Sequence, residues 1–162
     1  DSHVTAGCTA CVVAVHGSKV VCANAGDSRA VLSRKGKVVP LSFDHKPNQV
    51  GENRRIRRAG GFVKLANSHY RINGNLNLSR SIGDLKYKCV EALPPAEQII
   101  TAEPDILVGL SFSLFLFFSF LAFVSYRVSL SLSHFFLFFS SPPNQYACVY
   151  VIVLRIHYIC NL

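Results

Sequence analysis

The sequence lacks acidic residues in its last third. Its 162 residues include 9 carboxylates, and all of them lie between Asp1 and Asp105. The stretch after Ile106 has no carboxylate and only two bases, so the formal charge of +8 divides unevenly. Residues 1–106 carry 15 bases against 9 acids, or +6, and the rest carries +2. This excludes a single domain of even composition, and only the first piece has the composition of a water-soluble domain.

Further absences bear on origin and compartment. The sequence has no methionine and opens with Asp1 in what looks like the middle of a domain, so we expect the true N-terminus to lie upstream. The start has neither the basic lead nor the apolar run of a signal peptide. The 6 cysteines are scattered rather than regularly spaced, which favours reduced thiols inside a cell. We expect a cytoplasmic or nuclear protein, with the membrane as the alternative location.

The first 41 residues favour β-structure. Short apolar runs at residues 10–15, 19–23, 28–33 and 38–41 are separated by turn residues, which predicts two hairpins. In sequence order these four strands predict one antiparallel meander.

One helix is expected after Pro47. Asn48 is a good N-cap, and the segment through Ala59 mixes apolar residues with four arginines before Gly60 and Gly61 end it. A further strand is expected over 62–65. The first piece is therefore predicted to be a mixed α+β domain.

Ordered sequence blocks carry the strongest functional signal. Each block is weak alone, but their order and spacing together are specific. They are Gly7-Cys8-Thr9-Ala10, residues 24–32, Asp44-His45-Lys46-Pro47, Glu52 with Arg55-Ile56, residues 59–63, residues 73–84 and Glu103-Pro104-Asp105-Ile106. This series resembles the middle of the PP2C family of metal-dependent protein serine/threonine phosphatases, and it is most similar to the plant members.

The resemblance implies a fold and a chemistry. The expected fold class is α+β, a partial PP2C-type antiparallel β-sandwich flanked by helices over residues 1–106. The family's centre holds two Mg²⁺ or Mn²⁺ ions, whose bridging water attacks a phosphoserine or phosphothreonine. Carboxylate oxygens and waters suit such hard cations. The expected partners of the parent enzyme are phosphoprotein substrates, and no nucleic acid is expected.

Against this family the chain is incomplete. The upstream Asp-Gly-His-Gly-Gly block, the downstream Asp-Gly-x-Trp-Asp block and the terminal Asp-Asn pair are absent, and three core metal carboxylates go with them. We therefore expect no catalytic residue in this chain and no activity from it alone. Asp27 matches the aspartate that serves an additional, weaker third metal. Without the resemblance, Asp27 reads equally well as a turn residue that bonds its own backbone.

Four other features invite a functional reading. His45 could act as a general acid, but the family's acid histidine lies in the absent upstream block, so a structural loop role is expected. Asp84 is expected to cap the backbone after Gly83. Cys8 and Cys11 have redox or zinc spacing, yet on a strand they would face opposite sides, so buried small residues are expected instead. The arginines within residues 54–58 could bind nucleic acid or acidic lipid, but a solvated helix face is expected.

The tail, residues 107–162, is rich in Phe, Leu and Ser over 107–141 and has low complexity there. Residues 106–126 are about as long as the roughly 20 residues that span a bilayer. Phe, Leu and most Ser codons are rich in pyrimidines, and the Val108 codon supplies a GT splice donor, so we interpret the tail as a translated intron. The alternatives are a non-catalytic isoform that binds or competes and a membrane-anchored fragment.

Overall fold

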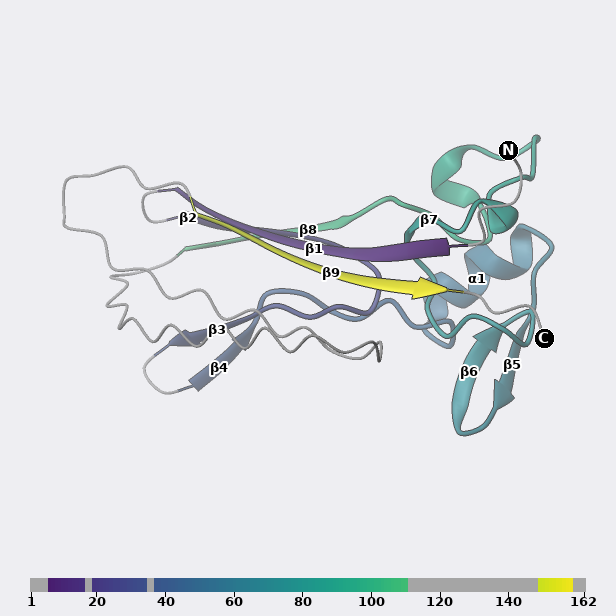
Figure 1. Ribbon diagram of the computed structural model, residues 1–162, viewed down its shortest axis with the longest axis horizontal. Helices are drawn as coiled ribbons and strands as arrows, with labels where there is room; N and C mark the ends of the chain where they lie inside the picture. Colours follow the sequence, from purple (N-terminus) through teal and green to yellow (C-terminus); the bar gives the residue numbers. More distant parts are fainter. Residues whose placement is uncertain (1–5, 17–18, 35–36, 111–148, 159–162) are drawn as a thin grey trace.

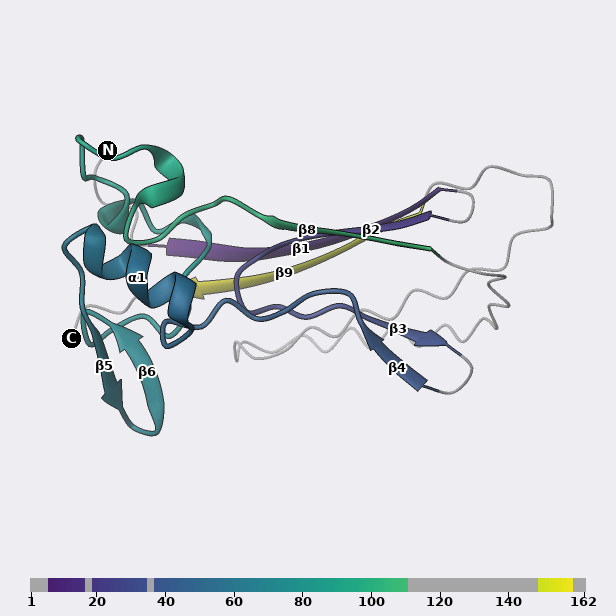
Figure 2. The ribbon, with the colours of Figure 1, turned by 180° about the vertical axis from the view of Figure 1, so that it is seen from behind.

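The computed structural model describes residues 6–16, 19–34, 37–110 and 149–158, the last of these by backbone alone. A long antiparallel sheet extends along the molecule (Figure 1). The helix α1 (Val50–Arg58) and the hairpin of β5 (Val63–Ala66) and β6 (His69–Ile72) gather at one end of this sheet in Figure 1. The hairpin of β3 (Val31–Arg34) and β4 (Lys37–Pro40) lies toward the other end (Figure 1). The reverse view in Figure 2 shows the same arrangement.

The long sheet is centred on β1 (Ala6–His16) and β2 (Lys19–Ala25), which form an antiparallel hairpin. The other edge of β2 pairs with β8 (Asp105–Leu110). The other edge of β1 pairs with β9 (Val149–Tyr158). The two-residue strand β7 (Ile82–Gly83) pairs with the start of β1. The first predicted hairpin is thus confirmed.

The predicted meander is wrong, although its second hairpin is confirmed. β3 (Val31–Arg34) and β4 (Lys37–Pro40) pair with each other in a separate two-stranded sheet. They cannot join the long sheet beside β2, because β8 already occupies that edge of β2. A third hairpin joins β5 (Val63–Ala66) to β6 (His69–Ile72).

The helix α1 (Val50–Arg58) begins one residue later than expected. Its N-cap is Gln49, not Asn48, and the Gln49 side chain bonds the carbonyl of Asp44 instead of the helix. Gly60, with φ of +85°, follows the helix end in the left-handed region that favours glycine. Two short 3₁₀ helices, η1 (Leu85–Tyr87) and η2 (Pro95–Glu97), precede β8.

Two hydrophobic clusters support these elements. One lies on the face of the long sheet that alternate positions of β1 and β2 present, and its buried members are Cys11, Val13, Val20, Cys22 and Leu41. The other packs around Ile56 of α1 with Ile72, Leu76, Leu78, Tyr87 and Ile100. Each fully buried Ile or Leu contributes about 1.5–3 kcal/mol relative to an exposed one. The segments that join the two clusters hold the polar residues described below.

The predicted boundary after Ile106 falls inside β8. In the part of the chain that the structure describes, no helix has the length and apolarity needed to cross a bilayer. Most of the candidate span, residues 111–126, lies outside the described residues.

Candidate metal-ligand loop and its supporting network

The loop that carries Asp27 leaves the long sheet where β2 ends. Gly26 has a φ of +127°, which side-chain-bearing residues rarely adopt. A Cβ atom on Gly26 would lie 2.6 Å from Cβ of Thr9 and 3.0 Å from the carbonyl oxygen of Arg80. Only glycine therefore fits at this position, and the tight packing fixes where the next residue, Asp27, leaves the strand.

The Asp27 carboxylate is buried against an ammonium group. Its side chain is 1% exposed, and Oδ2 lies 2.5 Å from Nζ of Lys46, whose side chain is 35% exposed. On the neighbouring residue, the Ser28 hydroxyl lies 2.6 Å from that of Thr9. A buried carboxylate needs a compensating positive charge. The Asp27 position is therefore one that holds a cation, and in this structure the cation is Lys46.

This geometry fits Asp27 as one ligand of a divalent ion, but not a complete metal site. Among the described residues, no group of three or more His, Cys, Asp or Glu side chains converges. Every acidic residue except Asp1 is described, and the tail contributes none. A carboxylate-rich centre for Mg²⁺ or Mn²⁺ would thus need ligands beyond the residues that the structure describes.

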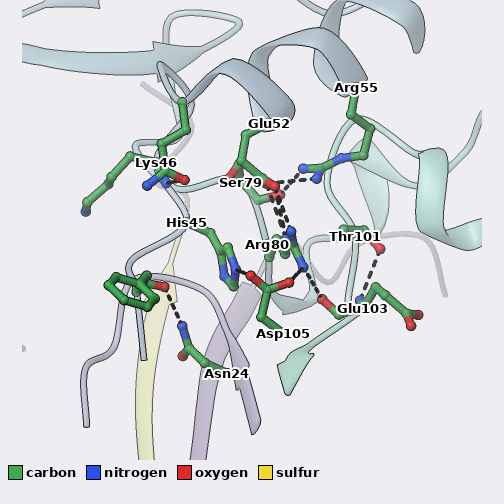
Figure 3. Close-up of polar contacts among 12 residues, drawn as sticks. Asn24, His45, Lys46, Glu52, Arg55, Ser79, Arg80, Thr101, Glu103 and Asp105 are labelled. Atoms are coloured by element: carbon green, nitrogen blue, oxygen red, sulfur yellow. Dashed lines mark hydrogen bonds and ion pairs between the residues drawn. The ribbon is translucent and has the colours of Figure 1, made fainter. Parts of the chain in front are cut away.

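His45 holds the backbone of Gly26 from two directions. Its Nδ1 accepts a hydrogen bond from the Gly26 amide at 3.0 Å, and its own amide donates to the Gly26 carbonyl at 2.9 Å. Since Nδ1 is an acceptor, the ring proton is on Nε2, which donates to Oδ2 of Asp105 at 3.1 Å. The imidazole is therefore neutral in this arrangement, and Figure 3 shows it facing Asp105.

Asp105, whose side chain is 66% exposed, connects His45 to the more deeply buried Arg80 and Glu52 (Figure 3). Arg80 donates from Nη1 to Oδ1 of Asp105 and from Nη2 to Oε1 of Glu52, each at 2.8 Å. Glu52, on α1 and 5% exposed, also accepts from Nη1 of Arg55 at 2.8 Å and from the Ser79 hydroxyl at 2.6 Å. We call Glu52, Arg80 and Asp105 the ion-pair chain; with Arg55 its formal charges balance.

The ion pairs shift the acidities of their members. Burial raises the pKa of Glu52, but hydrogen bonds from Arg80 and Ser79 and the charges of both arginines outweigh it, so the net pKa is lowered. Partial burial likewise raises the pKa of Asp105, but the His45 hydrogen bond and the Arg80 charge lower it overall. Both carboxylates therefore remain ionised at neutral pH.

Two further residues singled out from the sequence, Arg55 and Asp84, make hydrogen bonds within the structure. Arg55 is not on a solvated helix face, because it bonds Glu52 and the carbonyls of Ser79 and Gln98; the flanking arginines of the cluster are exposed. Asp84 accepts a hydrogen bond from Ser81, and η1 has no side-chain cap.

Cys8 and Cys11 lie on one strand, β1, and do not form a pair. Cys11 is buried with its Sγ 3.9 Å from that of Cys22, while Cys8 is only partly buried. The expected core position is confirmed for Cys11.

Sequence reasoning missed Glu52, Arg80 and Asp105 as a connected set. Each lies within or beside a recognised block, but they are separated by 28 and 25 positions. The one local signal was an acid in the first turn of a predicted helix, where it complements the helix dipole as well.

Comparison with known proteins places this geometry in a family. The family model for Protein phosphatase 2C matches residues 1–111. Over 104 residues the chain is 53% identical to Probable protein phosphatase 2C 11 of Oryza sativa subsp. japonica, covering 64% of this chain and 28% of that protein. It is also 53% identical over 103 residues to Protein phosphatase 2C homolog 2 of Schizosaccharomyces pombe, covering 63% and 27%.

A solved structure agrees. The crystal structure of a phosphatase from a pathogenic strain of Toxoplasma gondii superposes with a TM-score of 0.53 at 43% identity, over 57% of this chain and 28% of that chain. The chain thus spans between a quarter and a third of the length of these relatives. With the family model matching more than half of its residues, the chain belongs to the protein phosphatase 2C family.

Proposed function

We propose that residues 1–111 are a segment of a metal-dependent protein serine/threonine phosphatase and that this chain does not catalyse the reaction by itself. The observation that carries the proposal is the shortage of ligands. Asp27 is the one carboxylate at the candidate site, no metal-binding group of three or more residues forms in the described parts, and the tail has no acid to add.

Asp27 is the metal residue of this proposal. In the parent enzyme, bound Mg²⁺ or Mn²⁺ ions would supply an activated water and stabilise charge on the transferring phosphoryl group. The contribution of this chain is to present a buried carboxylate on a fixed loop. Lys46 neutralises that carboxylate here, so an ion that binds Asp27 has to displace the ammonium or share the carboxylate with it.

The substrates of the parent are proposed to be phosphoproteins, as for the family in general. Neither His45 nor any other residue of this chain is assigned a proton-transfer role. The His45 ring nitrogens are both engaged, one by the Gly26 amide and one by Asp105, so neither is available to a substrate.

The test is hydrolysis of a phosphothreonine peptide by the purified 162-residue chain in MnCl₂ or MgCl₂. Release of phosphate should not exceed the metal-only blank, while the full-length rice relative serves as the active control. Turnover that stops when a chelator is added would refute the proposal. Adding the chain to the active relative distinguishes an inert segment from the alternative, a non-catalytic binding module. A competing module would slow peptide hydrolysis by the relative, and an inert segment would not.

A further inference from the structure

We propose that His45 is a positioning residue for Asp27, acting through the Gly26 peptide, and that the ion-pair chain of Asp105, Arg80 and Glu52 fixes its imidazole. This inference rests on the proposed metal role of Asp27 for its functional meaning. The positioning itself depends only on contacts among the described residues.

His45 acts on Asp27 through the backbone amide and carbonyl of Gly26. The Gly26 amide donates to Nδ1 of His45, and the Gly26 carbonyl accepts from the His45 amide and from Nδ2 of Asn24 at 3.2 Å. The next atom beyond that carbonyl carbon is the nitrogen of Asp27. With both polar groups of Gly26 bonded and no room for a Cβ atom, the direction in which Asp27 leaves the strand is determined.

The imidazole can hold this backbone only in one tautomer. Nδ1 must lack a proton, which requires that the proton stay on Nε2, and the acceptor that keeps it there is Oδ2 of Asp105. The other oxygen of Asp105 is held by Arg80, and Arg80 is held by Glu52 on α1. The orientation of His45 thus depends, through Asp105 and Arg80, on Glu52 of α1.

A positioning role and a merely structural role predict different behaviour for two conservative variants. His45→Asn places an amide oxygen near the position of Nδ1, so it keeps the acceptor for Gly26 and loses the Asp105 bond. His45→Gln places an amide nitrogen near Nε2, so it keeps the Asp105 bond and leaves the Gly26 amide without an acceptor. The exposed Arg57→Gln on α1 is the matched control, since Arg57 bonds only the neighbouring Asn53.

The first readout needs no metal. In the ¹⁵N-labelled 162-residue chain, the Gly26 amide should exchange at least ten-fold faster with solvent in His45→Gln, and within three-fold of wild type in His45→Asn and Arg57→Gln. Ring ¹⁵N shifts should show the Nε2-protonated tautomer in wild type. Equal Gly26 exchange in wild type and His45→Gln would overturn the proposal. So would equal acceleration in both His45 variants along all of β1 and β2, which is the mark of a merely structural residue.

The second readout uses a chimera of the full-length rice relative in which residues 1–106 of this chain replace the matching segment. The MnCl₂ concentration for half-maximal peptide hydrolysis should rise at least five-fold in Asp27→Asn and in His45→Gln, but not in His45→Asn, with the rate at saturating Mn²⁺ unchanged in both His45 variants. If Asp27→Asn has no effect, the proposed metal role fails while the positioning result stands. If Asp27→Asn responds and His45→Gln does not, only the positioning inference fails.

Discussion

Replacing Glu52 by glutamine should destabilise the chain more than any other single isosteric change among its described acids. Glu52 is 5% exposed and accepts from Arg55, Ser79 and Arg80 at 2.6–2.8 Å at its closest contacts. Glutamine keeps the shape and one acceptor oxygen but removes the negative charge. The guanidinium groups of Arg55 and Arg80, whose side chains are 12% and 15% exposed, then lie close together without the carboxylate that neutralises them.

The magnitude follows from that residual charge. Removing one partner of a buried ion pair costs about 3–5 kcal/mol, and Asp105 still compensates part of the charge on Arg80. We therefore expect a loss of about 3 kcal/mol in the free energy of unfolding. Against a typical total of about 5–15 kcal/mol, this is a large fraction of the stability.

Urea unfolding of the full chain at pH 7 measures this loss, with Glu97→Gln on the exposed helix η2 as the control. The lowered pKa of Glu52 also fixes the sign of the pH dependence. Its stabilisation is complete above its ordinary pKa of 4.5 and is lost as the pH falls through the lower folded-state value. The difference in free energy of unfolding between wild type and Glu52→Gln should be constant from pH 7 to 5 and become smaller below pH 5. A loss under about 1 kcal/mol, the size expected of a surface pair, would refute the reasoning.

Three further predictions concern single residues. Gly26→Ala should cost at least about 3 kcal/mol in urea unfolding, because its Cβ would meet Thr9 and its φ of +127° is strained; an alanine variant as stable as wild type would contradict this. Arg29→Gln should lower the free energy of unfolding by under about 1 kcal/mol, because the Arg29 side chain of the Arg29–Asp44 ion pair is exposed to solvent. A larger loss in the same assay would show that the ion pair behaves as a buried one. Iodoacetamide should label the exposed Cys89 before Cys11 in the native chain, as measured by peptide mass spectrometry. A hydrogen bond from Cys22 lowers the pKa of Cys11 to about 7, but the burial of Cys11 blocks access of the reagent. Faster labelling of Cys11 than of Cys89 would show that the β1–β2 face opens to solvent.

The local parts of the fold could be predicted from sequence. Short apolar runs separated by turn residues predicted the hairpin of β1 and β2, and the glycines after Ala59 predicted the helix end. These signals act within a few residues, so one sequence is enough to read them. The helix start was missed by one residue because the Gln49 side chain turns back to Asp44, a contact that the capping preference of Asn48 does not reveal.

The long-range parts could not be predicted. β2 pairs with β8 across 85 residues at Cys22 and Leu107, and neither strand's residue pattern specifies its partner. The ion-pair chain has the same character, since Glu52 and Asp105 meet only through Arg80. The sequence block singled out Asp27, but its ion pair with Lys46 and the hydrogen bond of Gly26 with His45 depend on how two loops, 19 residues apart, meet.

A manganese titration of the purified 162-residue chain, with free Mn²⁺ measured by electron paramagnetic resonance, shows whether the chain completes a metal centre. One buried carboxylate, already paired with Lys46, provides too few ligands for a tight site. We expect no binding tighter than about 1 mM, the weak end of protein sites for hard divalent ions, and no change in Asp27→Asn. One or two ions bound at micromolar concentration, and lost on that substitution, would show that the chain completes a metal centre and would contradict the account.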